Sequence, residues 1–220
     1  MITNRLNIVI VSDGEAFAQA MNLRKEIFVG ECKLDENVEF DGNDYCATHI
    51  LALDGDKPIG TMRIRYFNGF VKMERMCVLK EYRKTDVAEQ IMQKGMHFVA
   101  QKGYDKVYGI CKKELLSRWQ KDGFEVIPDA PCVEQKGYQL IPVWCNLQKP
   151  DEYITMQTSA DVLNAKEGEW FKDKKSFAVN RIKALTDKVK LIKSETSSSK
   201  QKWFAPLIYP ISDKTDDKTY

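Results

Sequence analysis

Two adjacent cations, Arg83 and Lys84, lie between a strand-like segment and a helical pattern, an arrangement that can hold a phosphate. Residues 71–79 have the composition of a β-strand, and residues 87–99 place apolar side chains on one broad helical face. A helix that begins where a strand ends presents free N–H groups and the positive end of its dipole. Because the two cations add charge at that point, the expected chemistry is binding of a phosphorylated ligand.

The remaining pattern predicts an α+β fold in which a sheet positions this segment. Tight turns at residues 54–57 and 68–69 predict a three-stranded antiparallel meander that leads into the helix. A polar, acidic loop over residues 30–45 precedes the meander, and a loop of this length beside a site is more often functional than idle. The predicted strands cover residues 6–11, 46–53, 58–67, 71–79, 105–111, 124–127 and 138–146, and the predicted helices cover residues 15–29, 87 up to Gly103, and 112–121.

Length and composition limit the classes of protein to which this chain can belong. The chain has 220 residues, 43% of them hydrophobic and 30% charged, which is enough for one good core and an appendage. No apolar run is long enough to cross a membrane and no signal peptide is recognisable, so we expect a soluble, cytoplasmic protein. The six cysteines include no Cys-x-x-Cys pair and predict buried free thiols, and two histidines make a histidine-based metal site improbable. We expect no metal.

The run over residues 74–83 resembles the strand and loop that open the acyl-CoA site of GNAT-superfamily N-acyltransferases. In that family an Arg/Gln-x-x-Gly-x-Gly/Ala loop follows and wraps the pyrophosphate of coenzyme A. The first and last positions of the motif match here, and Asp86 replaces its middle glycine. The aligned loop reads Arg83, Lys84, Thr85, Asp86, Val87 and Ala88. The resemblance implies a GNAT fold over residues 1–150, a mixed central sheet with flanking helices.

Asp86 has two opposite expected effects. A carboxylate in the first helical turn favours the helix by about 0.3–1 kcal/mol, and Asp86 with Glu89 resembles a capping box. Against a bound pyrophosphate the same charge would repel, and a Cβ hinders the close backbone approach that glycine permits. An ordinary capped amphipathic helix therefore stays an alternative for this segment taken alone.

The resemblance also implies roles on the preceding strand. Backbone groups of Met76, Cys77 and Val78 would hydrogen-bond the pantetheine arm and polarise the acyl carbonyl. A protonated alkyl amine has a pKa of about 10.4 and must lose a proton before it attacks a thioester, so Glu74 is the candidate general base. The alternative is a structural carboxylate paired with one of three arginines. These are Arg63, Arg65 and Arg75.

Many members of the family protonate the leaving thiolate with a tyrosine, and Trp119 occupies that position here. An indole N–H cannot act as a general acid. Either the thiolate leaves without a tyrosine, another phenol such as Tyr138 replaces it, or turnover is slow. Core packing is the alternative role of Trp119.

The N-terminal part carries a second resemblance, over residues 23–31, 39–44 and 47–52, to the ElaA and YjcF branch of GNAT proteins. Acyl-homoserine-lactone synthases, which share the fold, have a similar arginine helix and acidic loop. In those synthases the acidic cluster helps to receive a cationic donor, so an electropositive acceptor is expected here. The implied substrate-binding residues are Arg24, Glu39, Asp41 and Asp44. The alternative is a solvated turn that ties Arg24 by a salt bridge.

Residues 151–220 lie beyond the resemblance and predict a C-terminal helical extension. Residues 178–192 have an amphipathic pattern of two heptads, residues 194–200 are Ser-rich, and residues 166–202 hold eleven Lys or Arg against five Asp or Glu. Packing on the chain's own domain, pairing in a homodimer, or contact with an anionic surface would each use this helix. No motif predicts specific nucleic-acid binding.

Two classes of function follow from these resemblances. The first is an N-acyltransferase that moves an acyl group from acetyl-CoA or another acyl-CoA to the amine of a small molecule or a protein. The second is a catalytically weak or inactive acyl-CoA-binding protein with a regulatory role, suggested by Asp86 and Trp119. An acyltransferase similar to the autoinducer synthases is a further alternative.

Overall fold

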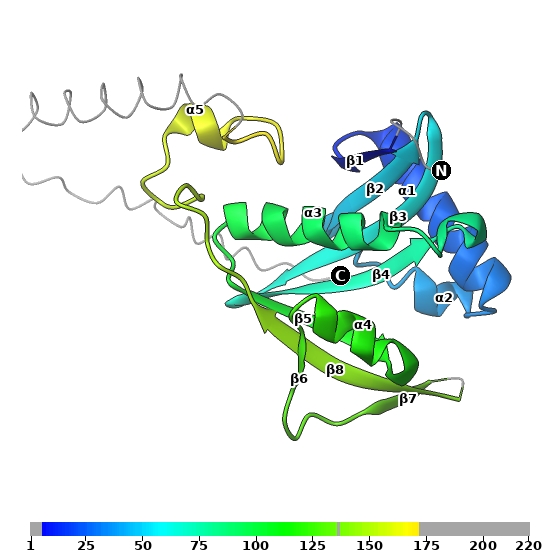
Figure 1. Ribbon diagram of the computed structural model, residues 1–220. Coiled ribbons are helices and arrows are strands. Elements are labelled where there is room, and N and C mark those ends of the chain that lie inside the picture. Colours follow the sequence, from blue (N-terminus) through cyan, green and yellow to red (C-terminus); the bar gives the residue numbers. More distant parts are fainter. Residues whose placement is uncertain (1–5, 136, 172–220) are drawn as a thin grey trace, which may run out of the picture. The chain divides into compact units, whose positions relative to one another are not determined.

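The computed structural model describes residues 6–135 and 137–171 of the chain (Figure 1). In this described part, eight strands form one mixed sheet in the order β1-β2-β3-β4-β5-β8-β6, with β7 paired to β8. The pairing of β4 with β5 is parallel and the other pairings are antiparallel. The strands are β1 (Leu6–Ile10), β2 (Thr48–Asp54), β3 (Lys57–Phe67), β4 (Phe70–Val78), β5 (Lys106–Lys112), β6 (Glu125–Val126), β7 (Val133–Gln135) and β8 (Tyr138–Asn146). The predicted α+β class is confirmed, and β7 is an element that the sequence pattern did not predict.

The three predicted helices are observed in the predicted order, one with a change of geometry, while α2, within the predicted loop over residues 30–45, and α5 were not predicted. The helix expected over residues 15–29 is an α-helix, α1 (Gly14–Arg24), that continues as a π-helical segment, Lys25–Glu31. Its N-terminus is capped by Asp13, whose side chain accepts a hydrogen bond from the Ala16 N–H at 2.8 Å. The other helices are α2 (Glu36–Glu39), α3 (Val87–Gln101), α4 (Leu116–Lys121) and α5 (Ala160–Leu163), and single 3₁₀ turns cover Asp44–Cys46, Lys80–Tyr82 and Lys113–Leu115.

The strand β3 separates two different environments, because successive side chains of a strand point to opposite faces. Met62 faces α3, where a Cβ on Gly95 would lie only 2.4 Å from the Met62 Cε atom, so the missing side chain lets the helix approach the sheet closely. Arg63, the next residue, is fully buried among the carboxylates near α1. Figure 1 shows α3 and α4 in front of the sheet, and α1 on its other side.

The sheet opens between β4 and β5. Only three residue pairs join these strands, and the last is Met73 with Gly109. Beyond this pair the two strands diverge into separate arms of the sheet, which we call the β4–β5 fork (Figure 1). At the same point β4 contains a bulge, because Arg75 and Met76 lie opposite the single residue Met62 of β3.

The chain after β8 packs back onto the sheet domain. Trp170 is buried and its ring stacks on Phe98 with centroids 5.4 Å apart. The Ile154 N–H donates to the Gln101 carbonyl at the end of α3 at 2.8 Å. Lys102 is ion-paired to Glu167 at 2.5 Å. Residues 151–171 therefore share the core of the preceding part, whereas the predicted amphipathic helix, linker and tail lie outside the described residues. The domain boundary at residue 150 stays a prediction.

Cysteine placement differs from the prediction in part. Three cysteines are buried and three are exposed, and all six are free thiols. The buried ones are Cys77, Cys111 and Cys145, and the exposed ones are Cys32, Cys46 and Cys132. Within the described ranges, no helix has the length and apolar character needed to cross a membrane.

Candidate functional site

The N-terminus of α3 lies directly beyond the fork edge of β4. After β4 ends at Val78, one 3₁₀ turn leads to the start of the helix at Val87. The Thr85 hydroxyl donates to the Tyr82 carbonyl at 2.6 Å and accepts weakly from the Val87 N–H at 3.4 Å. The predicted strand, turn and helix are therefore confirmed.

The capping box expected from Asp86 and Glu89 is wrong. Asp86 occupies the N-cap position, but its side chain makes no capping hydrogen bond. Its carboxylate instead accepts from the Gln90 side-chain amide at 2.8 Å, and Glu89 accepts from Gln93 at 3.1 Å. The physical reason is backbone geometry: Asp86 has φ −85° and ψ 3°, whereas a capping residue usually has extended dihedral angles.

Arg83 connects three parts of the structure. Its Nε atom donates to the Val78 carbonyl at the end of β4 at 3.0 Å. Its two terminal nitrogens donate to the two carboxylate oxygens of Glu31 at 2.5 and 2.6 Å. Glu31 ends the π-helical segment after α1 and lies far from Arg83 along the chain, so no local sequence pattern predicts this pairing. The fork edge, the arginine and this segment are therefore fixed together.

The backbone of β4 presents Val78 to the fork. The Leu79 N–H donates to the Ile59 carbonyl at 2.9 Å on the β3 side. Because backbone groups of neighbouring residues in a strand point to opposite sides, those of Val78 point toward the fork and those of Cys77 toward β3. Of the residues expected to meet the pantetheine arm, Val78 has the clearest backbone orientation for it.

A closed ring of alternating charges lies on the α1 side of β3 and β4. We call it the ion-pair ring, and its members in order are Arg24, Glu39, Arg75, Asp41, Arg63 and Asp44. From Arg24, the N–O distances are 2.6 Å to Glu39, then 3.0 Å from Glu39 to Arg75 and 3.8 Å from Arg75 to Asp41. They continue with 2.8 Å from Asp41 to Arg63 and 2.9 Å from Arg63 to Asp44. A contact between Asp44 and Arg24 closes the ring. All four residues predicted as substrate-binding belong to it.

Four of the six ring members are buried, Arg75 and Asp41 are partly exposed, and the charges of the ring balance. Arg24, Arg63 and Glu39 have no exposed side-chain surface. Hydrogen bonds from Arg63 lower the pKa of Asp41 despite partial burial. Burial raises the pKa of Asp44, but the hydrogen bonds from Arg24 and Arg63 outweigh it, so this pKa also lies below its usual value. Three guanidinium groups against three carboxylates leave no net charge, so the geometry favours the salt-bridge alternative for the acidic loop.

Glu74 is attached to the ring through Arg63. One carboxylate oxygen accepts from the Arg63 Nη2 atom at 2.8 Å, and the other lies 2.7 Å from the Lys72 ammonium. Burial raises the pKa of Glu74, but Lys72 and Arg63 together lower it by a larger amount, so this pKa lies below its usual value. A carboxylate that is ionised and held on both oxygens favours the structural alternative over the general base.

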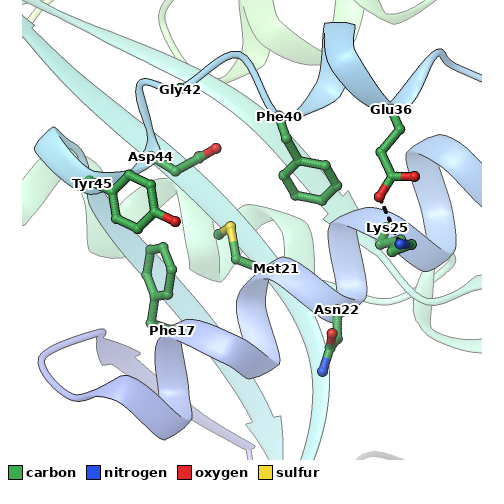
Figure 2. Close-up of a pocket in the computed structure, with 9 residues that line it drawn as sticks. All are labelled: Phe17, Met21, Asn22, Lys25, Glu36, Phe40, Gly42, Asp44 and Tyr45. Carbon is green, nitrogen blue, oxygen red and sulfur yellow. Dashed lines mark hydrogen bonds and ion pairs between the residues drawn. The ribbon is translucent and has the colours of Figure 1, made fainter.

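A hollow of about 370 Å³ lies between α1 and the acidic loop, and Asp44 of the ring is among its lining residues (Figure 2). Figure 2 shows Phe17 and Tyr45 side by side and the Asp44 side chain above Met21. The lining residues are Phe17, Met21, Asn22, Lys25, Glu36, Phe40, Gly42, Asp44 and Tyr45. None of them belongs to β4 or β5, so this hollow is not part of the fork.

Trp119 packs at the inner end of the fork. A Cβ on Gly109 would lie 2.5 Å from the Trp119 Cζ3 atom, so the indole ring rests directly on the backbone of the last residue paired with β4. The ring also meets Phe124 edge to face, with centroids 4.7 Å apart. This packing agrees with the core-packing alternative.

Comparisons with known proteins define the class. The model of the Acetyltransferase (GNAT) family matches residues 17–116. The N-acetyltransferase YjcF of Bacillus subtilis (strain 168) is 30% identical over 124 residues, which are 56% of this chain and 89% of YjcF. The chain therefore belongs to the GNAT acetyltransferase family, and it is an acyltransferase by class.

Solved structures confirm the fold. Escherichia coli ElaA is 23% identical with a TM-score of 0.57, and the match covers 64% of this chain and 99% of ElaA. The CoA-dependent acyl-homoserine lactone synthase BjaI, solved with SAM and isopentyl-CoA, is 18% identical with a TM-score of 0.56, over 66% of this chain and 84% of that one. The predicted GNAT fold and both predicted resemblances are confirmed.

The structure brings the predicted site residues into two groups. The fork edge and the start of α3 hold the predicted cofactor-binding residues, and the ion-pair ring holds the predicted substrate-binding residues with Glu74 at its rim. The pairing of Glu31 with Arg83 was not predicted. Arg63 was predicted only as a possible partner of Glu74, which it is, and its place in the ring was not predicted. Alternation along β3 could have placed Arg63 on the α1 face, but no sequence signal identified Asp41 and Asp44 as its partners.

Proposed function

We propose that this protein transfers an acyl group from acetyl-CoA or another acyl-CoA to a primary amine by direct attack. The observation that carries the proposal is the fork: β4 and β5 stop pairing at Met73 and Gly109, and α3 begins one turn beyond the free edge of β4. Within a GNAT acetyltransferase, this geometry offers an open strand edge to an extended ligand and a helix N-terminus to its phosphates.

The donor would lie along the fork. Backbone groups at Val78, with Met76 and Cys77 beside it, would bind the pantetheine arm. The loop from Arg83 to Ala88, with Lys84, Thr85, Asp86 and Val87 between them, would receive the pyrophosphate. The structure of BjaI with isopentyl-CoA supports an acyl-CoA as donor.

The reaction requires a neutral amine. Its lone pair forms a bond to the thioester carbonyl carbon, the C–S bond breaks, and the sulfur leaves as a thiolate that takes up a proton from solvent. Because Glu74 is ionised and doubly paired, we propose that it anchors Arg63 and Lys72, and that the amine proton leaves through water. In this scheme the ring fixes the acidic loop beside β4, and an amine of a small molecule or protein approaches past its rim.

A second candidate is an acyl-CoA-binding protein with slow turnover. Two observations favour it: both oxygens of Glu74 are occupied by cations, and Trp119 cannot protonate a thiolate. The first experiment is thermal melting of the full chain with and without acetyl-CoA, since a ligand at one hundred times its Kd stabilises the folded state by about 2.7 kcal/mol. A shift with free-thiol release in an amine screen supports the transferase. A shift without thiol release supports the second candidate, and no shift with any acyl-CoA contradicts both.

A further inference from the structure

Arg75 has a backbone conformation that arginine rarely adopts. Its φ is 53°, in the left-handed region that disfavours residues with a Cβ. It lies two residues after Met73, the last residue of β4 that pairs with β5. The strained residue therefore begins the part of β4 that forms the edge of the fork.

The left-handed conformation puts two neighbouring side chains on one face. In a regular strand Glu74 and Arg75 would point to opposite faces of the sheet. Here Glu74 contacts Arg63 at 2.8 Å, and Arg75 lies 3.8 Å from Asp41, which itself binds Arg63 at 2.8 Å. Both side chains therefore reach the same charged group, and the bulge is what allows it.

Three contacts hold Arg75 in place. One terminal nitrogen donates to the Val38 carbonyl at 2.8 Å, and Nε lies 3.0 Å from the second carboxylate oxygen of Glu39. Glu39 is itself fully buried, and its first oxygen accepts from Arg24 at 2.6 Å. The third contact is the longer one to Asp41. The hydrogen bond to Val38 and the ion-pair contact to buried Glu39 tie the guanidinium to the acidic loop, and so tie down the backbone that carries it.

The bulge decides which groups of β4 face α3. Val78 lies on that side, because its Cγ2 atom and Ile91 Cδ1 of α3 both lie within 3.2 Å of where a Cβ on Gly60 would be. A slip of one residue would move every side chain beyond Arg75 to the other face and turn the Val78 backbone away from the fork. The register of the fork edge therefore depends on the conformation of Arg75.

We propose that Arg75 is a positioning residue for the acyl-CoA donor, because its clamp to Val38 and Glu39 holds the β4 bulge and so sets the strand edge that meets the pantetheine arm. The inference rests on the proposed function. In this way the acidic loop, through Val38 and Glu39, shapes the donor site from the opposite face of the sheet.

The test compares two ligands by calorimetry on the full chain. Acetyl-CoA reaches both the phosphate loop and the fork edge, whereas adenosine 3′,5′-bisphosphate carries only the nucleotide end. In Arg75→Ala and Arg75→Gly we expect acetyl-CoA affinity to fall at least about tenfold, while adenosine 3′,5′-bisphosphate affinity changes less than about twofold. Glycine tolerates the left-handed backbone but lacks the clamp, so the second variant separates the clamp from the conformation.

Arg65→Ala is the matched control. Arg65 touches the same network, 3.9 Å from Glu74, and its side chain is 25% exposed against 23% for Arg75, but it lies on β3 and has no part in the bulge. It should keep the affinity for both ligands.

Wild-type acetyl-CoA affinity in Arg75→Gly would overturn the inference, and so would an equal loss for both ligands, which marks general unfolding. If Arg75→Ala does not fold, Arg75→Lys, which retains one cation for Glu39, should restore part of the acetyl-CoA affinity lost in Arg75→Gly. Failure of the wild type to bind acetyl-CoA contradicts the proposed function instead.

Discussion

Glu31 and Arg83 form a bidentate ion pair across 52 residues of chain, with N–O distances of 2.5 and 2.6 Å. The guanidinium that the family motif assigns to the pyrophosphate is thus engaged by a carboxylate at the end of a π-helical segment. A pyrophosphate that takes Arg83 has to displace this carboxylate or share the guanidinium with it.

We therefore expect Glu31→Gln to tighten coenzyme A binding. Because an exposed ion pair contributes little, the gain in affinity should reach about fivefold at most. Calorimetric titration at low salt measures it, because screening weakens the competition at high salt. The control is Glu36→Gln, which removes an exposed carboxylate paired with Lys25 and should leave the affinity unchanged. Weaker binding in Glu31→Gln would mean that the pair supports the site rather than competing for it.

Asp86→Gly should also tighten coenzyme A binding. Glycine removes a negative charge and a Cβ from the start of α3, and Asp86 makes no capping hydrogen bond that would be lost. The helix itself should lose up to about 1 kcal/mol through propensity. Glu89→Gln removes a charge from the same helical turn without a backbone change, so it separates charge from close approach. Unchanged or weaker affinity in a folded Asp86→Gly variant would contradict the alignment of this loop with the family motif.

The variant Glu74→Gln distinguishes two roles of Glu74, a structural anchor for Arg63 and Lys72 and a general base for the amine. As an anchor, its loss leaves Arg63 and Lys72 with poorer partners, and the free energy of unfolding should fall by about 1–3 kcal/mol while the pH profile of the rate keeps its shape. A general base would instead cost on the order of 10²–10⁴ in rate, with a smaller loss at high pH. Denaturant unfolding and a pH-rate profile with an active amine measure both. Glu81→Gln, an exposed carboxylate paired with Lys57, is the matched control.

Acid should destabilise the protein through the ion-pair ring. The pKa values of Asp41, Asp44 and Glu74 are lowered in the folded state, so their contribution is fully present above their unfolded pKa values, which are about 4. It is lost as the pH falls through the lower folded values. These three carboxylates should therefore leave the free energy of unfolding level from pH 7 to about 5 and lower it below about 4. Burial lowers the pKa of His49, which adds a loss of stability as the pH falls through about 6.5. Burial raises the pKa of Glu39, so this member of the ring opposes the loss in acid. Asp41→Asn should lower the free energy of unfolding at pH 7 and flatten the acid slope, and an unchanged slope would contradict this role of the ring.

Trp170→Ala tests whether the chain beyond residue 150 belongs to the same core. Trp170 is 7% exposed and stacks on Phe98, so its truncation should cost about 3–5 kcal/mol. Met156→Ala, at a residue that is 96% exposed, should change stability by less than about 0.5 kcal/mol. A chain ending at Pro150 should melt lower or aggregate, whereas one ending at Phe171 should not. Equal melting of the two chains would support an independent extension from residue 151.

Much of the fold was predictable because it depends on local patterns. The strand predicted over residues 138–146 is observed with the same bounds, and the meander and the long helix α3 differ by a few residues at most. Alternation, turn residues and helical periodicity act over short distances, so one sequence shows them directly. The two-residue strand β6 and the three-residue strand β7 carry too few residues for a clear pattern.

The sequence by itself determined the class of fold, the order of strand, turn and helix around Arg83, and the membership of Glu39, Asp41 and Asp44 in one charged group with Arg24. Only the tertiary structure decided that the group closes into a neutral ring through Arg63 and Arg75. It also decided that Asp86 turns to Gln90 and that Glu31 holds Arg83. The reason is physical. A sequence shows each charge, but the partner of that charge depends on which strands and loops meet in the fold. It also depends on which face of the sheet the side chain occupies, and one bulge can change that face.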